Sequence, residues 1–256
     1  MEHRQQYEER LGELFRNGMR GRMGRVFAEY VSKFSEPDRR FDVLYLDGLF
    51  ATGTPPKPLR RRDRFRRLIQ EFERALPLEG LVAECGCASG LSSFLLCSTL
   101  RQHDPSFDGA GYEIYDSFQG LSEPQPEDSL KPGADELVAE SLVAGRFAFP
   151  LERVRQSLKD FPRIAYGPGW IPEAFPRDER RYRFAHVDVD LYQPTKAAFE
   201  YFWPRLSRRG DGLRRLQLDW GEACGARVRS GGWSFVYDDA DHSGGIQQMS
   251  WPILAA

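Results

Sequence analysis

The sequence lacks several features that would point to particular classes of protein. No apolar run approaches the roughly 20 residues that cross a bilayer, and residues 1–20 are charged, without the apolar core of a signal peptide. The four cysteines show no paired C-x-x-C spacing, which argues against a zinc site and a disulfide framework. The formal charge of -2 gives no reason to expect a nucleic acid or a membrane as partner. We therefore expect a cytoplasmic protein.

The length and the N-terminal segment indicate one large α/β domain with an added cap. A chain of 256 residues can bury a substantial core. Residues 1–36 are charged and helix-friendly, and residues 41–46 fit a short strand or an amphipathic turn. Apolar spacing predicts a helix over residues 61–75, and we interpret the arginine run 60–67 as its solvated face rather than as a phosphate-binding patch.

Residues 81–90, which read LVAECGCASG, form the stretch around which the chain is organised. An apolar strand leads to Glu84, the glycines Gly86 and Gly90 follow, and residues 91–100 are typical of a helix. A buried strand that passes through a glycine turn into a helix forms the ligand crevice of α/β sheets, because glycine lets backbone N–H groups approach a ligand. The nicotinamide fingerprint G-x-G-x-x-G requires glycine where Ala88 stands, which argues against a nicotinamide-dependent oxidoreductase.

A second strand is predicted over residues 112–116, and it ends in a carboxylate. In nucleotide-binding α/β folds an acidic residue about 20–30 positions after the glycine loop commonly accepts hydrogen bonds from ribose hydroxyls. Asp116 is the better candidate because it ends the apolar run, and Glu113 is the reserve. A loop follows, residues 122–133 are rich in proline and acidic residues, and a short third strand is predicted over residues 163–166.

Residues 183–190 predict a further core strand, with a helix opening at Pro194. With a period of two, His186, Asp188 and Asp190 share one face of this strand. At the carboxyl end of a central strand, Asp188 could act as a general base toward a hydroxyl or as an oxygen ligand for Mg²⁺. We interpret His186 as a packed strand residue, and for Asp190 helix capping and chemistry stay open.

These motifs together resemble the macrocin/mycinamicin/novobiocin O-methyltransferase family. The resemblance covers residues 78–209 and rests on E-C-G with Ser92, on D-S-F-Q-G-L from Asp116, and on D-V-D-L-Y from Asp188. It implies an α/β Rossmann-like class I fold, with a mostly parallel sheet, helices on both faces and an incomplete C-terminal part. It also implies the use of S-adenosylmethionine (SAM) and a divalent metal to methylate a hydroxyl of a sugar or phenol.

Residue by residue, the resemblance places SAM and the metal at the motifs just described. The implied cofactor-binding residues are Glu84, Cys85, Gly86, Gly90, Ser92, Asp116 and Ser117. Asp188 is implied as both metal ligand, for Mg²⁺, and catalytic base. The arginine that the family carries in its glycine loop is missing, since Ala88 and Ser89 lie there.

The sequence departs from the family pattern after Leu206. The family continues with an apolar strand and D-D-Y, whose aspartates complete the metal site, whereas this chain has neither at that place. The next reading frame permits a D-D-Y-N-W string, so we interpret residues 210–256 as a frameshifted tail that is poorly ordered and leaves the sheet one strand short. The alternative is an insertion, with a displaced strand over residues 232–237 followed by Asp238 and Asp239 as metal ligands.

The sequence therefore predicts three segments and one activity. Residues 1–77 form an N-terminal helical cap, residues 78–209 the SAM-binding domain, and residues 210–256 the non-native tail. The predicted activity is SAM-dependent methylation of a small-molecule hydroxyl, and loss of activity is predicted if the tail is frameshifted. The alternatives are a SAM-binding module without catalysis and, against the glycine pattern, a nicotinamide oxidoreductase. No nucleic-acid or membrane partner is expected, and a homo-oligomer is possible.

Overall fold

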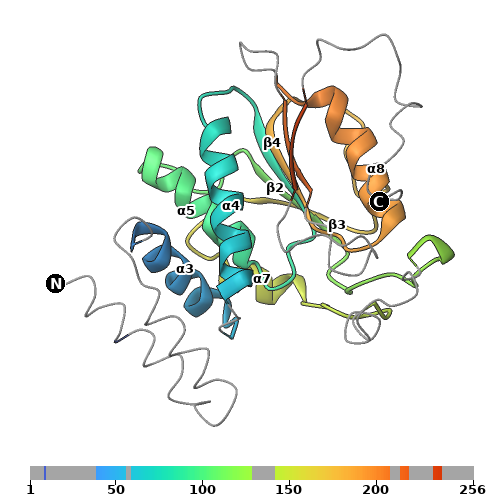
Figure 1. Cartoon of the computed structure of the whole chain (residues 1–256), viewed down its shortest axis with the longest axis horizontal. Helices are drawn as coiled ribbons and strands as arrows, with labels where there is room; N and C mark the ends of the chain where they lie inside the picture. Colours follow the sequence, from blue (N-terminus) through green and yellow to red (C-terminus); the bar gives the residue numbers. More distant parts are fainter. Residues whose placement is uncertain are drawn as a thin grey trace.

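A computed structural model of the chain describes residue 9 and residues 40–55, 62–128 and 142–207, and the backbone alone of residues 39, 59–61, 214–218 and 233–237. Its centre is a six-stranded sheet with the strand order β3-β2-β1-β4-β5-β6 (Figure 1). The strands are β1 (Leu81–Cys85), β2 (Tyr112–Asp116), β3 (Ala165–Pro168), β4 (Tyr182–Val187), β5 (Arg214–Leu218) and β6 (Trp233–Tyr237). All neighbouring pairs are parallel except β5 and β6. The predicted mostly parallel α/β sheet is confirmed.

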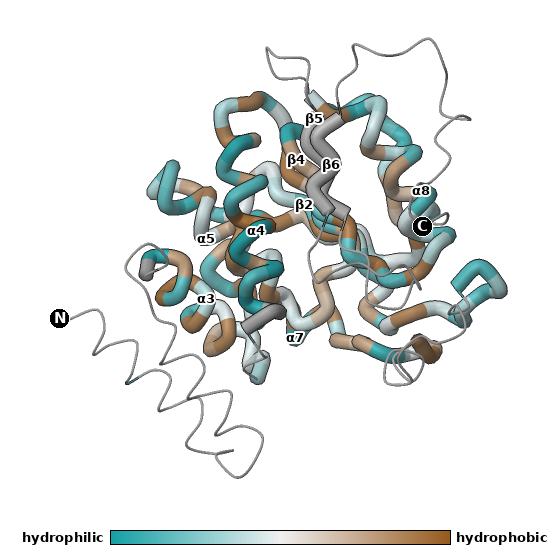
Figure 2. The backbone as a smooth tube through the Cα atoms, viewed as in Figure 1, coloured by the Kyte–Doolittle hydropathy of each residue, from teal (hydrophilic) through white to brown (hydrophobic). Residues whose placement is uncertain are grey.

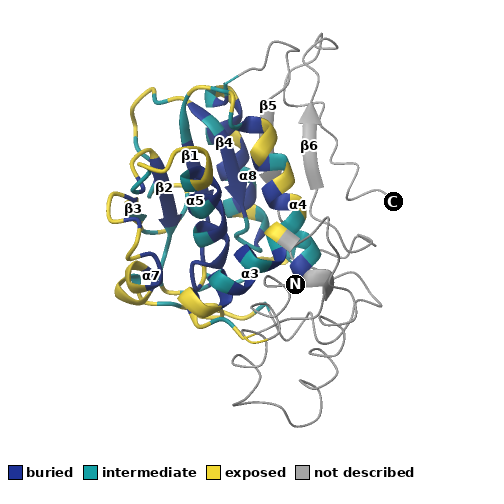
Figure 3. Ribbon diagram, turned by 90° about the vertical axis from the view of Figure 1, so that its left-hand side faces the viewer, coloured by how far each residue is buried: buried dark blue, intermediate teal, exposed yellow. Residues whose placement is uncertain are grey.

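Helices cover both faces of this sheet. They are α3 (Arg39–Thr52), α4 (Leu59–Ala75), α5 (Leu91–His103), α7 (Leu151–Ser157) and α8 (Tyr192–Phe202), with short 3-10 turns at Pro126–Asp128 and Trp203–Arg205. Along β1 the side chains alternate between two apolar clusters, as a period of two requires. Val82 packs with α3, α4, α5 and α7, whereas Ala83 and Cys85 pack with α8 on the other face. Strands β1, β2 and β4 are therefore largely buried, whereas the edge strand β3 is partly exposed (Figure 3). Figure 2 shows the hydropathy of the same elements along the backbone.

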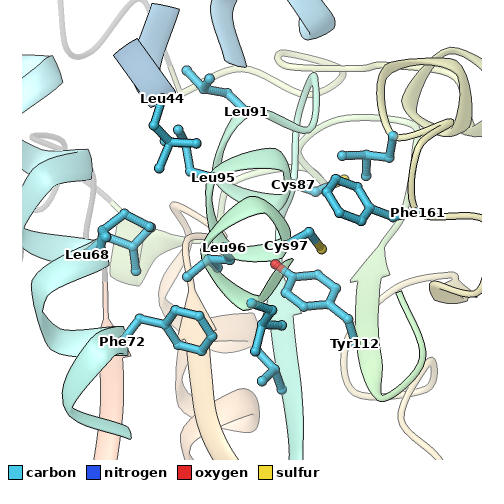
Figure 4. Packing of buried hydrophobic residues seen from close by; sticks show 14 of the residues in the cluster. Leu44, Leu68, Phe72, Cys87, Leu91, Leu95, Leu96, Cys97, Tyr112 and Phe161 are labelled. Carbon is cyan, nitrogen blue, oxygen red and sulfur yellow. The ribbon is translucent and has the colours of Figure 1, made fainter. Parts of the chain in front are cut away.

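The larger cluster joins the N-terminal helices to the sheet. Leu44 of α3, Leu68 and Phe72 of α4, and Leu95 and Leu96 of α5 are buried within it, and Figure 4 shows them meeting around α5. Helices α3 and α4 thus share one core with the sheet-forming residues.

The expectation of a strand or turn over residues 41–46 is wrong, because these residues lie inside α3. Leu49 extends their apolar stripe by a further turn, and the helix packs against α5, which a six-residue window cannot reveal. Gly48 allows this close packing, since a Cβ at that position would stand 2.8 Å from Cδ1 of Leu91.

Helix α4 forms over the predicted residues, but the interpretation of its arginines as a solvated face is wrong at two positions. The guanidinium of Arg62 is buried and forms an ion pair with the carboxylate of Asp42, which is 1% exposed. Arg64 forms an ion pair with Asp188, in the loop after β4. Arg67 is exposed as predicted.

The prediction that the sheet lacks a strand beyond β4 is also wrong. Residues Arg214–Leu218 form β5, which pairs in parallel with β4 through Ala185–Leu216 and its neighbours. Without this strand, the buried β4 would present a row of unpaired N–H and C=O groups at the edge of the sheet. The strand predicted by the insertion alternative is present as β6, antiparallel to β5. Asp238 and Asp239 lie outside the described residues, and the frameshift itself stays a prediction about the gene.

Candidate active site

The acidic ends of three neighbouring strands lie at one edge of the sheet. Strand β1 pairs with β2 on one side and β4 on the other, and Glu84 of β1 stands opposite Ile114 and His186. Asp116 ends β2, and Asp188 directly follows β4. In open α/β sheets this carboxyl edge is where ligands bind. The three carboxylates singled out in the sequence therefore belong to one region of the molecule.

The loop that leaves β1 is a tight turn, in which left-handed backbone recurs at Gly86, Ala88 and Gly90, with φ of 79°, 45° and 90°. A Cβ at residue 86 would stand 2.0 Å from the main-chain oxygen of Asp188, so only glycine fits there. Gly90 precedes α5 and has no side chain to accept from the first-turn N–H groups of the helix. These N–H groups are suited to an anionic ligand group.

Asp116 ties this loop to the next one. Its Oδ2 accepts a hydrogen bond of 2.8 Å from the backbone N–H of Cys87, and its Oδ1 accepts one of 2.7 Å from the N–H of Phe118. The neighbouring Ser117 hydroxyl donates to the carbonyl of Gly120 at 2.8 Å and so closes the turn after β2. The carboxylate of Asp116 is half-buried and keeps lone pairs that can accept further hydrogen bonds.

Glu84 lies beneath the loop. Its side chain is fully buried and accepts hydrogen bonds from the hydroxyl of Ser93, in the first turn of α5, and from the hydroxyl of Tyr112 at 2.8 Å. Burial raises the pKa of Glu84, against the opposing effects of His186 and the neighbouring hydroxyls. The period of two points this side chain toward α5 rather than out of the edge of the sheet. Ser92, also predicted as a cofactor-binding residue, is 8% exposed in the same helical turn.

Asp188 occupies the loop after β4, and its main chain is held on β1. Its N–H donates to the carbonyl of Cys85 at 2.8 Å, and its own carbonyl lies against Gly86. Its Oδ2 lies 3.3 Å from Nη2 of Arg64, with both side chains about one-fifth exposed (22% and 21%). The thiol of Cys85 faces the opposite cluster beneath α8, so this residue meets the site through its backbone.

The prediction that His186, Asp188 and Asp190 share one strand face is wrong, because β4 ends at Val187. Asp190 has a left-handed backbone, with φ of 58°, which interrupts the alternation. His186 is 1% exposed and packed within the sheet, as predicted, and burial lowers its pKa.

The described residues do not fit the metal site that the family resemblance implies. Among them, no group of three histidine, cysteine or acidic side chains is placed to hold a metal ion. Hard divalent cations require several oxygen ligands, whereas the carboxylate of Asp188 faces a guanidinium.

Arg64 is the site residue that sequence reasoning missed. It lies in α4, 124 positions before Asp188, within an arginine-rich run that looks like an ordinary solvated helix face. No local signal separates it from the neighbouring arginines, because the contact depends on how α4 packs on the sheet.

Comparison with known proteins places this arrangement in a family. Residues 83–211, just over half of the 256 residues, match the model of a family described as a methyltransferase domain. The 8-demethyl-8-(2,3-dimethoxy-alpha-L-rhamnosyl)-tetracenomycin-C 4'-O-methyltransferase of Streptomyces olivaceus is 28% identical over 162 residues. That match covers 59% of this chain and 58%, less than two thirds, of the relative.

Two solved structures are similar to this fold. The calicheamicin methyltransferase CalS11 has a TM-score of 0.50 and 19% identity over 84% of this chain and 77% of its own. The O-methyltransferase NovP has a TM-score of 0.48 and 21% identity over 63% of this chain and 65% of its own. The sheet order, the glycine turn at the carboxyl end of β1 and the matched residues agree with the resemblance found in the sequence: this chain belongs to the methyltransferase domain family.

Proposed function

We propose that this protein transfers a methyl group from SAM to a hydroxyl group of a small natural product. The observation that carries the proposal is the meeting of Asp116, the glycine turn and Asp188 at one edge of the sheet, in a chain of the methyltransferase domain family. This edge can take a nucleoside on one side and an acceptor on the other. Metal chemistry forms no part of the proposal.

In this proposal SAM lies over the turn between β1 and α5. The ribose hydroxyls donate to Asp116, whose position is already fixed by two backbone N–H groups. The carboxylate of the methionine part accepts from N–H groups at the start of α5, beside Gly90 and Ser92. Ser117 holds the loop after β2 in place. Glu84 supports the turn from below through Ser93, because it is too deeply buried to reach the cofactor.

Asp188 is the proposed catalytic base. Its carboxylate takes the proton of the acceptor hydroxyl, while the oxygen forms a bond to the methyl carbon and the bond from that carbon to the sulfonium breaks. The products are a methyl ether, S-adenosylhomocysteine and protonated Asp188. Such a transfer requires the oxygen and the methyl carbon to be held about 3 Å apart, in line with the leaving sulfur.

The most informative acceptor to test first is a sugar hydroxyl on a polyketide. The family match over residues 83–211 includes Glu84, Asp116 and Asp188. The relative from Streptomyces olivaceus is named for the 4'-oxygen of a rhamnosyl tetracenomycin. Its demethylated acceptor, 8-demethyl-8-(2,3-dimethoxy-α-L-rhamnosyl)-tetracenomycin C, is therefore the first probe.

The test is calorimetry of the full chain with SAM, followed by mass spectrometry of the probe after incubation. We expect Asp116→Asn to weaken SAM binding at least tenfold. The amide has a single oxygen acceptor, so it cannot accept from the N–H groups of both Cys87 and Phe118 as the two carboxylate oxygens do. Asp188→Asn is expected to keep SAM binding and to lose methylation. Absence of SAM binding by the wild type refutes the proposal. Binding without transfer to any hydroxyl acceptor favours the alternative of a non-catalytic SAM-binding module.

A cytoplasmic location and a homo-oligomer stay predictions. Among the helices that the structure describes, none combines the length and apolar character needed to cross a membrane.

A further inference from the structure

The arginine run of α4 performs two separate tasks in the fold. Arg62 points toward α3 and forms a buried pair with Asp42. Two positions further along, Arg64 reaches the loop after β4, and its Nη2 lies 3.3 Å from Oδ2 of Asp188. Arg67 of the same helix is exposed. Arg64 is therefore directed at the candidate active site.

The pairing with Arg64 restrains the orientation of the Asp188 side chain, which the main-chain contacts do not determine. The backbone of this residue is held by the carbonyl of Cys85 and by the contact with Gly86. Only the side-chain torsions remain to be set, and a guanidinium that donates to Oδ2 restrains them. The guanidinium stays protonated at all relevant pH values, so it supplies a fixed positive charge without acting as a competing base.

The other charged groups near Asp188 do not supply this charge. His186 is buried on the preceding strand, and burial lowers its pKa, so it is neutral at neutral pH. Glu84 is an acid facing α5. No cluster of acidic or histidine ligands for a divalent ion exists among the described residues. The positive partner of Asp188 in this part of the chain is an arginine side chain.

We propose that Arg64 is a positioning residue that supplies the positive charge beside Asp188, in the place where a divalent metal would otherwise contact this carboxylate. The catalytic aspect rests on the proposed function, whereas the pairing of Arg64 with Asp188 and the expectation that Asp188 binds no metal can be tested without it. Arg64 acts through Asp188 and holds its carboxylate toward the acceptor hydroxyl.

The first test measures the binding of Mn²⁺ to the full chain by electron paramagnetic resonance and calorimetry, with wild type and Asp188→Asn. We expect no stoichiometric site with a dissociation constant below about 1 mM that depends on Asp188, because one carboxylate already paired with a guanidinium binds hard cations poorly. A one-to-one Mn²⁺ site that Asp188→Asn abolishes overturns the inference.

The second test measures thermal unfolding of Arg64→Gln, Asp188→Asn and the double variant. If the two side chains are paired, the second substitution lowers the melting temperature little once the first has been made. The summed decreases of the two single variants should then exceed the decrease of the double variant by about 1–3 °C. The matched cycle with Arg67→Gln is expected to be additive. Additive losses for Arg64 and Asp188 overturn the pairing.

The third test separates positioning from simple stabilisation. With the rhamnosyl probe, we expect Arg64→Gln to lower kcat about tenfold or more while the SAM dissociation constant changes less than about twofold. Arg64→Lys should recover part of the loss, since it restores the charge without the planar donors, and a chelator should leave the wild-type rate unchanged. Equal kcat values for Arg64→Gln and wild type refute positioning. A wild type that does not bind SAM instead refutes the proposed function, and the first two tests still decide the metal site and the pairing.

Discussion

Replacing Gly86 by alanine tests the close contact between the glycine turn and the loop after β4. The new Cβ would stand 2.0 Å from the main-chain oxygen of Asp188, far inside any contact distance, and the residue would also hold φ at 79°. A left-handed backbone alone costs a non-glycine residue about 1–2 kcal/mol. Relief of the clash requires the Asp188 peptide to move by about 1 Å, which breaks the 2.8 Å hydrogen bond from its N–H to the carbonyl of Cys85 and costs about 1 kcal/mol more.

We therefore expect Gly86→Ala to lower the free energy of unfolding by about 2–3 kcal/mol, the sum of these two contributions, measured by urea denaturation. Gly145→Ala is the matched control, because Gly145 has a similar φ of 76° but nothing within 4 Å of an added Cβ. It should lose only about 1–2 kcal/mol. Equal losses in the two variants, within about 0.5 kcal/mol, would refute the argument that the contact with Asp188 fixes glycine at residue 86.

Three further predictions concern buried charges and thiols. Burial raises the pKa of Glu84 above its ordinary value of 4.5, so that in this pH range the folded state retains a proton that the unfolded chain loses. The free energy of unfolding of the wild type should therefore fall by up to about 1.4 kcal/mol per pH unit as the pH rises from 4.5 through the raised pKa. Urea denaturation of Glu84→Gln should lack this slope, and an unchanged slope contradicts the assignment. Asp42→Asn leaves the buried guanidinium of Arg62 without its main counter-charge and should lower the free energy of unfolding by about 3 kcal/mol. Asp63→Asn removes a more exposed partner of Arg62 and should lower it by less than about 1 kcal/mol. Equal losses would argue against the buried pair. Burial raises the pKa of the thiols of Cys85, Cys87 and Cys97. A disulfide reagent at pH 8 should therefore modify at most one cysteine of the native protein, and all four after denaturation. Modification of any of the three buried thiols in the native protein would contradict this.

Much of the sheet could be predicted from the sequence because its signals are local. Apolar runs that end in an acidic residue identify β1, β2 and β4, and the glycines after Glu84 identify the turn into α5. Parallel strands end at the same edge, so the approach of Asp116 and Asp188 follows once the strands are known. The helix α3 was not predictable from residues 41–46 alone, since its apolar stripe becomes apparent only over the full length of Arg39–Thr52.

The ion pairs that complete the arrangement join residues far apart in the sequence, so no local sequence pattern predicts them. The pairs of Arg64 with Asp188 and of Arg62 with Asp42 bring together residues that are 124 and 20 positions apart. In the sequence both arginines look like a solvated helix face. The orientation of Glu84 was available from the period of two, which places it on the same face as Val82, beneath α5. The family resemblance, by contrast, implies a cofactor-binding role for Glu84.

The main-chain contact at Gly86 has a consequence for the order in which ligands bind. The turn proposed to carry the cofactor and the loop that carries Asp188 touch with no intervening side chain, so neither can shift by a large fraction of an ångström independently. An acceptor that alters the position of Asp188 must therefore alter the affinity for SAM, and linkage requires SAM to alter the affinity for the acceptor by the same factor. Under the proposed function, we therefore expect the two substrates to bind cooperatively, because Gly86 lacks a Cβ and brings the two loops into contact.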